Sequence, residues 1–133
     1  MKTLLLDSSI YISSLNRLDP FHQKTKDFIQ DREKASEEIG VIVPILIVLE
    51  VANILKKSPQ EIMRFFVGGE IIELDQDLAG KLIPLFKSMP LKTSDAVIAG
   101  IAKIYKAELV RWDKKLIKEA KKLVKVYTPE EVV

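Results

Sequence analysis

The chain has 133 residues, 47% hydrophobic and 30% charged, which is the composition of one globular domain over residues 1–133 rather than of a disordered chain. A net charge of +2 argues neither for nor against a polyanionic partner, and the absence of cysteine excludes disulfides, thiolate metal sites and a cysteine nucleophile. The single histidine, His22, argues against a multi-histidine zinc site. The first apolar run, Leu4–Leu6, is too short for a signal sequence and ends at Asp7, so we expect a cytoplasmic protein.

Apolar runs of strand length alternate with helical patterns along the chain. The predicted strands are Thr3–Leu6, Gly40–Val43, Ile71–Leu74, Leu109–Arg111 and Val124–Tyr127. The predicted helices are Ser8–Leu18, Phe21–Glu38, Pro44–Lys57, a short segment between Ser58 and Gly68, Gln76–Met89, Ser94–Tyr105 and Asp113–Leu123. This alternation predicts an α/β fold with a parallel central sheet and helices on both faces. Such folds bind ligands beyond the carboxyl ends of their strands, where the strand order reverses.

Four acidic residues stand beside apolar segments: Asp7, Glu50, Asp95 and Asp113. Asp7 and Asp113 lie at the carboxyl ends of two predicted strands, whereas Glu50 and Asp95 lie in apolar helices. Carboxylates are seldom buried unless they are paired or bind a metal. If the first and fourth strands are neighbours, Asp7 and Asp113 converge at one edge of the sheet.

Each of these acids also has a local structural explanation. Asp7 and Asp113 are good N-caps for the helices that follow them, and Asp95 suits the first turn of a helix because of the helix dipole. Glu50 shares a helix face with Asn53 and Lys57, and that face could simply point to water.

The local explanations do not account for the joint pattern. Several carboxylates gathered beside a core repel one another, and a divalent cation would neutralise them. Mg²⁺ prefers oxygen ligands and keeps several of its waters. Ions of this kind can activate water for phosphodiester cleavage. The four acids therefore predict one cation-binding site that the fold assembles.

At these residues the chain resembles the PIN-domain nucleases, most closely the small VapC-type ribonuclease toxins of prokaryotes. The resemblance covers essentially the whole length. The segments that carry it are Leu4-Leu5-Leu6-Asp7-Ser8-Ser9, Val48-Leu49-Glu50-Val51-Ala52-Asn53, Thr93-Ser94-Asp95-Ala96-Val97-Ile98-Ala99 and Leu109-Val110-Arg111-Trp112-Asp113. Their order and spacing are more specific than any one of them alone.

The resemblance implies a three-layer fold whose parallel sheet has the strand order 3-2-1-4-5. It implies that Asp7, Glu50, Asp95 and Asp113 are the catalytic, metal-binding acids, with Ser9 at a frequent small hydroxyl position. It further implies Mg²⁺- or Mn²⁺-dependent cleavage of RNA, often by a homodimer that has a cognate antitoxin encoded alongside.

Four residues are candidates for supporting roles. The Ser9 hydroxyl could steady a carboxylate or a water, Asn53 could orient Glu50 or hold a metal-bound water, and Thr93 is a good N-cap for the apolar helix. Arg111 stands where the family usually has threonine or serine. An arginine there could pair with Asp113 or contact a phosphate, and either would alter metal occupancy.

Two other functions compete with a metal-dependent endoribonuclease. The first is a non-catalytic PIN-like module that binds RNA or protein without turnover. The second is a phosphoacceptor signalling domain, in which Asp75 would be the acceptor, although Asp7-Ser8-Ser9 lacks the paired acid that such a domain needs.

Overall fold

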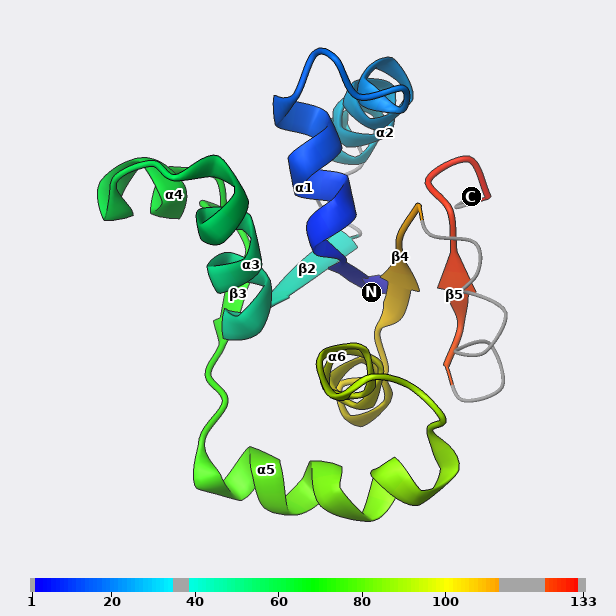
Figure 1. Cartoon of the computed structure of the whole chain (residues 1–133). Helices are drawn as coiled ribbons and strands as arrows, with labels where there is room; N and C mark the ends of the chain where they lie inside the picture. Colours follow the sequence, from blue (N-terminus) through cyan, green and yellow to red (C-terminus); the bar gives the residue numbers. More distant parts are fainter. Residues whose placement is uncertain (1, 35–38, 113–123, 132–133) are drawn as a thin grey trace.

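Five strands form one parallel sheet in the order β3-β2-β1-β4-β5 (Figure 1). The computed structural model describes residues 2–34, 39–112 and 124–131. The strands are β1 (Lys2–Leu6), β2 (Ile39–Pro44), β3 (Glu70–Ile72), β4 (Glu108–Val110) and β5 (Val126–Tyr127). The α/β fold, the parallel sheet and its strand order are therefore as predicted.

The central strand β1 is flanked by β2 and β4, which makes it the point where the strand order reverses. Leu4 and Leu5 are fully buried in β1, and Leu109 and Val110 are fully buried in β4. Such continuous apolar strands are expected when both faces of a parallel sheet are covered. The register pairs Leu6 with Val110, so both strands end at the same edge of the sheet.

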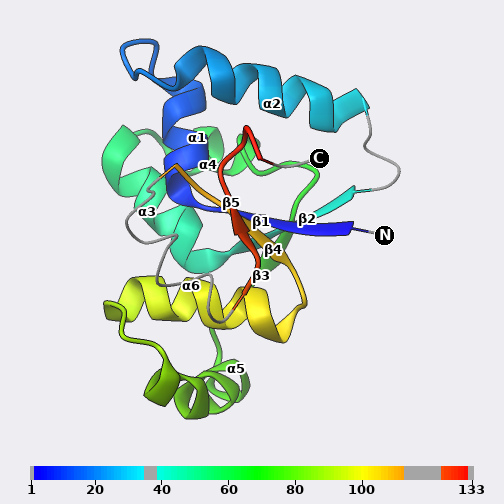
Figure 2. The ribbon, with the colours of Figure 1, turned by 90° about the vertical axis from the view of Figure 1, so that its right-hand side faces the viewer.

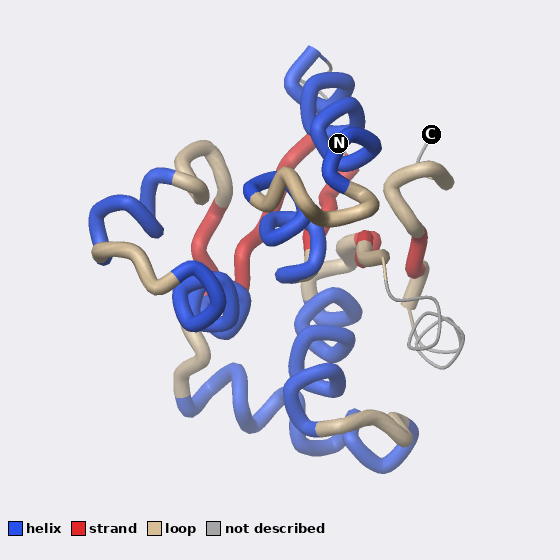
Figure 3. Tube along the Cα trace, turned by 45° about the horizontal axis from the view of Figure 1, so that its top comes forward, coloured by secondary structure: helices blue, strands red, loops and turns tan. Residues whose placement is uncertain are grey.

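Helices cover both faces of this sheet (Figure 2). Helices α1 (Ser8–Leu15) and α2 (His22–Lys34) lie on one face, and α5 (Gln76–Leu82) and α6 (Thr93–Ile104) lie on the other. Helix α3 (Ile45–Leu55) packs against α1 and α4 (Pro59–Arg64). Figure 3 shows the strands between these helical layers. In the described part of the chain, no helix is both long and apolar enough to cross a membrane.

Several helices end before the predicted residue: α3 ends at Leu55 rather than Lys57 and α6 at Ile104 rather than Tyr105, and the differences are larger in α1 and α5. Helix α1 stops at Leu15, three residues before the predicted Leu18, and Leu18 is 94% exposed. Helix α5 gives way at Ile83 to a 3₁₀ segment, η2 (Ile83–Ser88), instead of continuing to Met89. Pro84 accounts for this change because it lacks the N–H that an α-helix would use there. The predicted helix at 113–123 lies outside the described residues.

The short helix α4 begins as its sequence predicts. The Ser58 hydroxyl accepts a hydrogen bond from the Glu61 backbone N–H at 3.2 Å and donates to the Glu61 carboxylate at 3.1 Å. Pro59 occupies the first turn, where a missing N–H does no harm. The Ser58 side chain is thus the N-cap of α4, and its hydroxyl also contacts the Glu61 carboxylate.

Helix α6 is the most deeply buried helix segment near the candidate site. All residues from Ala96 to Ala102 are buried, as its apolar sequence predicts. At Gly100 a Cβ atom would lie 2.6 Å from Leu82 Cδ2, so glycine permits the close contact between α6 and α5. Because α6 is fixed in this way, its first turn and Asp95 are held in place as well.

Candidate active site

Asp7 follows β1 at the edge where β1 and β4 end. Its backbone N–H donates to the Val110 carbonyl at 2.9 Å, which ties Asp7 to the end of β4. Asp7 occupies the N-cap position of α1, as the local explanation predicts, but its side chain makes no capping hydrogen bond. Instead, Asp7 Oδ2 lies 3.7 Å from Arg111 Nη2, and Asp7 is only 7% exposed. The carboxylate therefore faces another charge rather than the helix end.

Asp95 lies in the first turn of α6 and approaches the same arginine. Its Oδ1 lies 3.5 Å from Arg111 Nη2, the nitrogen that also faces Asp7. One guanidinium nitrogen thus stands between two carboxylates that are 88 positions apart in the sequence (95 minus 7). Both distances are at or beyond the limit of a close hydrogen bond, so the contacts are ion pairs at long range.

Arg111 itself is almost completely buried. It is 5% exposed, and in the described part of the chain its Nε has no hydrogen-bond partner. A buried charge is costly unless its donors are satisfied. Arg111 therefore has two carboxylates nearby, but within the described residues its Nε donor is not satisfied.

Glu50 on α3 completes the charged group and is half-buried. Burial raises the pKa of Glu50 above its ordinary value, and the negative charges of Asp7 and Asp95 raise it further. The positive charge of Arg111 acts in the opposite direction and lowers this pKa in part. We call Asp7, Glu50, Asp95 and Arg111 the acidic cluster. Its carboxylates outnumber its single cation.

Two of the supporting residues do not take the positions that were expected. Thr93 is not the N-cap of α6, because the helix already includes Thr93 and the cap is Lys92, whose carbonyl accepts from the Ala96 N–H at 2.8 Å. Asn53 is exposed, and its Oδ1 accepts a hydrogen bond from Lys56 Nζ at 2.8 Å, so this oxygen is engaged on the surface of α3.

Ser9 has a structural role at the edge of the acidic cluster. Its Oγ accepts a hydrogen bond from the Trp112 backbone N–H at 3.3 Å. This contact links the start of α1 to the residue that follows Arg111. Ser9 thus helps to fix the chain next to Arg111.

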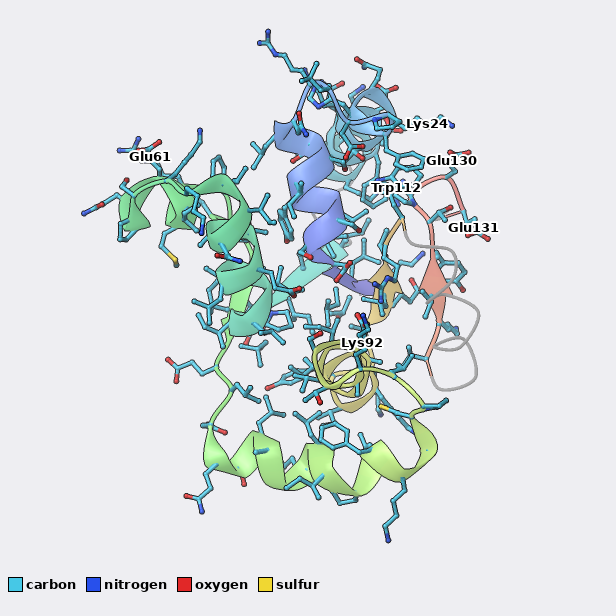
Figure 4. All side chains as sticks on the ribbon, viewed as in Figure 1. Lys24, Glu61, Lys92, Trp112, Glu130 and Glu131 are labelled. Carbon is cyan, nitrogen blue, oxygen red and sulfur yellow. The ribbon has the colours of Figure 1, made fainter. Side chains whose placement is uncertain are left out.

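A second polar group lies on the other side of β4 and was not singled out from the sequence. Trp112 Nε1 donates to Thr25 Oγ1 at 2.8 Å, and Thr25 Oγ1 lies 2.7 Å from Ser13 Oγ. The Trp112 ring stacks on Phe21 with centroids 4.3 Å apart, and His22 Nδ1 lies 2.8 Å from the Ser13 carbonyl oxygen. Figure 4 shows Trp112 near α2 and beyond the end of β4.

We call Trp112, Thr25 and Ser13 the tryptophan network. The sequence does contain a signal for this network. Thr25 lies three residues before Phe28, so both lie on the buried face of α2. A hydroxyl on a buried helix face needs a partner in the core.

The oxygen donors of the acidic cluster fit a hard divalent cation, which prefers carboxylates. Burial is the larger cause of the raised pKa of Glu50, and the negative charges of Asp7 and Asp95, which such an ion would neutralise, add to it. As the side chains lie, however, the described residues contain no group of three or more His, Asp or Glu side chains close enough to hold one ion. Asp113, the fourth predicted acid, lies outside the described residues.

The PIN domain family model matches residues 4–123, so the chain belongs to the PIN domain family. No curated protein matches the sequence.

Three solved structures share the fold. The VapBC2 complex of Rickettsia felis, bound to a promoter DNA fragment, has a TM-score of 0.71 at 17% identity and covers 95% of this chain and 98% of its own. A toxin–antitoxin complex from Klebsiella pneumoniae has a TM-score of 0.69 at 22% identity, covering 97% and 99%. VapC20 of Mycobacterium tuberculosis, a toxin that cleaves the sarcin–ricin loop, has a TM-score of 0.65 at 13% identity, covering 86% and 93%.

Proposed function

We propose that this protein is a Mg²⁺- or Mn²⁺-dependent endoribonuclease and the toxin of a toxin–antitoxin pair. The observation that carries the proposal is the approach of Asp7 and Asp95 to Arg111 at the carboxyl ends of β1 and β4, with Glu50 on α3 near enough for their charges to raise its pKa. Membership of the PIN domain family supports nuclease activity. RNA as the substrate is supported by the fold that the chain shares with a toxin described as cleaving the sarcin–ricin loop.

Asp7, Glu50, Asp95 and Asp113 are the residues that would hold the cation. When bound, a divalent cation supplies a more acidic water and charge stabilisation for phosphodiester hydrolysis. The protein's own contribution is position. Asp7 is fixed by the strand pairing of β1 with β4, and Asp95 is fixed by the buried helix α6.

A cognate antitoxin is the proposed protein partner. An apolar groove of about 390 Å³ runs between α1, α2 and residues 65–69. Its lining includes Tyr11, Leu15, Phe28, Phe65 and Val67. Val67 is 83% exposed beside this groove, so its substitution changes the surface of the groove rather than the core. We expect Val67→Asp to weaken binding of the protein encoded beside this one, measured by isothermal titration.

A homodimer is the proposed assembly. Leu49 and Ile54 on α3 are each 59% exposed, and burial of such side chains between two copies would favour association. Light scattering of the purified protein measures its mass directly. A mass of about 15.1 kDa, that of one chain, at micromolar concentration would contradict the dimer.

The test of the nuclease is cleavage of a mixed RNA substrate with Mn²⁺ or Mg²⁺. Wild type, Asp95→Asn and an EDTA control are compared, and circular dichroism verifies the fold of each protein. Cleavage that requires both the metal and Asp95 supports the proposal. Equal cleavage by wild type and Asp95→Asn, or cleavage in EDTA, would reject the assigned site.

A non-catalytic PIN-like binding module is the second candidate. The observation that favours it is the position of Arg111 between Asp7 and Asp95, where a cation would otherwise neutralise both acids. RNA binding without cleavage, and with no change in melting temperature at millimolar Mn²⁺, would support this candidate.

A further inference from the structure

We infer that Arg111 is an internal counterion that competes with the divalent cation for Asp7 and Asp95. In the metal-free protein its guanidinium offsets part of the negative charge of the two acids, and metal binding requires the guanidinium to leave them. The inference rests on the proposed function in that it concerns the same site. Its test measures metal binding rather than cleavage, so the two can fail separately.

The geometry supports competition because one nitrogen serves both acids. Arg111 Nη2 lies 3.7 Å from Asp7 Oδ2 and 3.5 Å from Asp95 Oδ1, so it stands in the region that both carboxylates face. A cation bound to both carboxylates would need the same region. Two positive charges within a few ångströms repel strongly in a partly buried site, so both cannot stay.

Arg111 is also held loosely enough to be displaced. Its contacts to the carboxylates are longer than a close charge-assisted hydrogen bond, which is about 2.7–2.9 Å. Its buried Nε has no hydrogen-bond partner in the described part of the chain. Withdrawal of the guanidinium therefore breaks no tight hydrogen bond to Asp7 or Asp95. It also exposes Nε, which has no acceptor among the described residues.

The ion pairs explain how the fold tolerates its acids without a metal. Without Arg111, the half-buried Glu50 and the carboxylates of Asp7 and Asp95 would repel one another with no nearby cation in the acidic cluster. Arg111 relieves part of that repulsion. The same residue should thus stabilise the metal-free protein and weaken its affinity for metal.

The first experiment is titration of Mn²⁺ alone into wild type, Arg111→Thr and Lys92→Thr by isothermal titration calorimetry. Lys92 directly precedes α6 and is exposed (Figure 4), so its substitution removes one positive charge without removing the guanidinium between the acids. We expect Arg111→Thr to bind Mn²⁺ at least about tenfold more tightly than wild type, because the positive guanidinium within a few ångströms of the ion has been removed. Lys92→Thr should change affinity much less, because exposed charges are screened by solvent and salt.

The second experiment compares melting temperatures in EDTA and in millimolar Mn²⁺. In EDTA, Arg111→Thr should melt below wild type because the acids have lost their counterion. Mn²⁺ should then raise the melting temperature of Arg111→Thr more than that of wild type. If Arg111 only supports the fold, the melting temperature of Arg111→Thr would instead lie below that of wild type by the same amount in EDTA and in Mn²⁺.

Three results would overturn the inference. They are unchanged or weaker Mn²⁺ affinity in Arg111→Thr, an equal gain in Lys92→Thr, and no Mn²⁺ binding by either Arg111→Thr or wild type. If wild type binds Mn²⁺ and cleaves RNA while Arg111→Thr gains no affinity, the inference fails and the proposed nuclease stands. If Arg111→Thr gains affinity but neither protein cleaves RNA, the inference stands and the nuclease fails.

Discussion

Arg111 and Trp112 are neighbours in the sequence, yet their side chains belong to two polar groups of opposite character. Trp112 reaches toward α2 and Arg111 toward α6, and these helices lie on opposite faces of the sheet (Figure 2). In the tryptophan network each polar side-chain atom has a partner within 2.8 Å. In the acidic cluster the contacts are 3.5 Å and longer, and a buried Nε is unpartnered in the described part of the chain.

The contrast separates a structural group from a functional one. A satisfied, buried hydrogen-bond network rigidifies a fold. An excess of like charge with long contacts stabilises little by itself and suits a site that must accept another ion or a substrate. Substitutions in the tryptophan network should therefore affect stability, and substitutions in the acidic cluster should affect activity. The following predictions test this division, starting with the largest expected effect.

Asp7→Asn should lower RNA cleavage by about 100-fold or more, because it removes a charge from a metal-binding position. Stability should change less than cleavage, because asparagine keeps the side-chain shape and the contact that is lost, to Arg111 Nη2, is long at 3.7 Å. Cleavage rates and urea denaturation on the same preparations measure both quantities. Retained cleavage, or a large loss of stability, would remove the contrast between the two groups.

Thr25→Val should lower the free energy of unfolding by about 1–3 kcal/mol, because it keeps the side-chain shape but leaves the buried Trp112 Nε1 without its acceptor. Cleavage per folded molecule should be unchanged. Thr3→Val, at a half-buried position in β1, is the matched control. If Thr25→Val abolished cleavage in fully folded protein, the tryptophan network would belong to the site.

Ser9→Ala should have a smaller effect, lowering the free energy of unfolding by about 0.5–1 kcal/mol, because it removes one long hydrogen bond to the Trp112 N–H. Ser9 lies where the two groups meet, so a fall in cleavage larger than the fall in stability would assign Ser9 to the acidic cluster. Chemical denaturation and cleavage of the same RNA distinguish these results.

Glu50→Gln should change stability by a small amount and should raise it, whereas Thr25→Val and Ser9→Ala lower it. The pKa of Glu50 is raised in the folded protein, so the folded state binds this proton more tightly than the unfolded state does. Its contribution to stability is therefore greatest at low pH and is lost as pH rises from the ordinary glutamate pKa through the raised one. Metal-free Glu50→Gln should melt slightly above wild type at pH 8.

The difference between Glu50→Gln and wild type should shrink as pH is lowered below the ordinary glutamate pKa. Melting curves in EDTA across this range measure it, and Glu33→Gln, at an exposed position on α2, is the control. If Glu50→Gln melts below wild type at pH 8, the folded protein stabilises the charged form of Glu50. That result would contradict the raised pKa of Glu50.

Much of the fold could be predicted from the sequence because its signals are local. The predicted helix Ser94–Tyr105 and its apolar character agree with the buried helix α6. The errors lie at element ends, where local patterns are weak. Leu18 continued an apolar period but is exposed, and Thr93 was a better cap by residue type than Lys92, yet the helix begins at Thr93.

The site divides in the same way. That Asp7, Glu50 and Asp95 stand beside core segments could be predicted from the sequence, since burial of the neighbouring apolar residues follows from their pattern. Only the tertiary structure decided what those carboxylates face. Pairing of β1 with β4 sets Asp7 beside Arg111, and packing of α6 brings in Asp95. Charges meet across strand pairs and helix packing, and no local pattern encodes those distances.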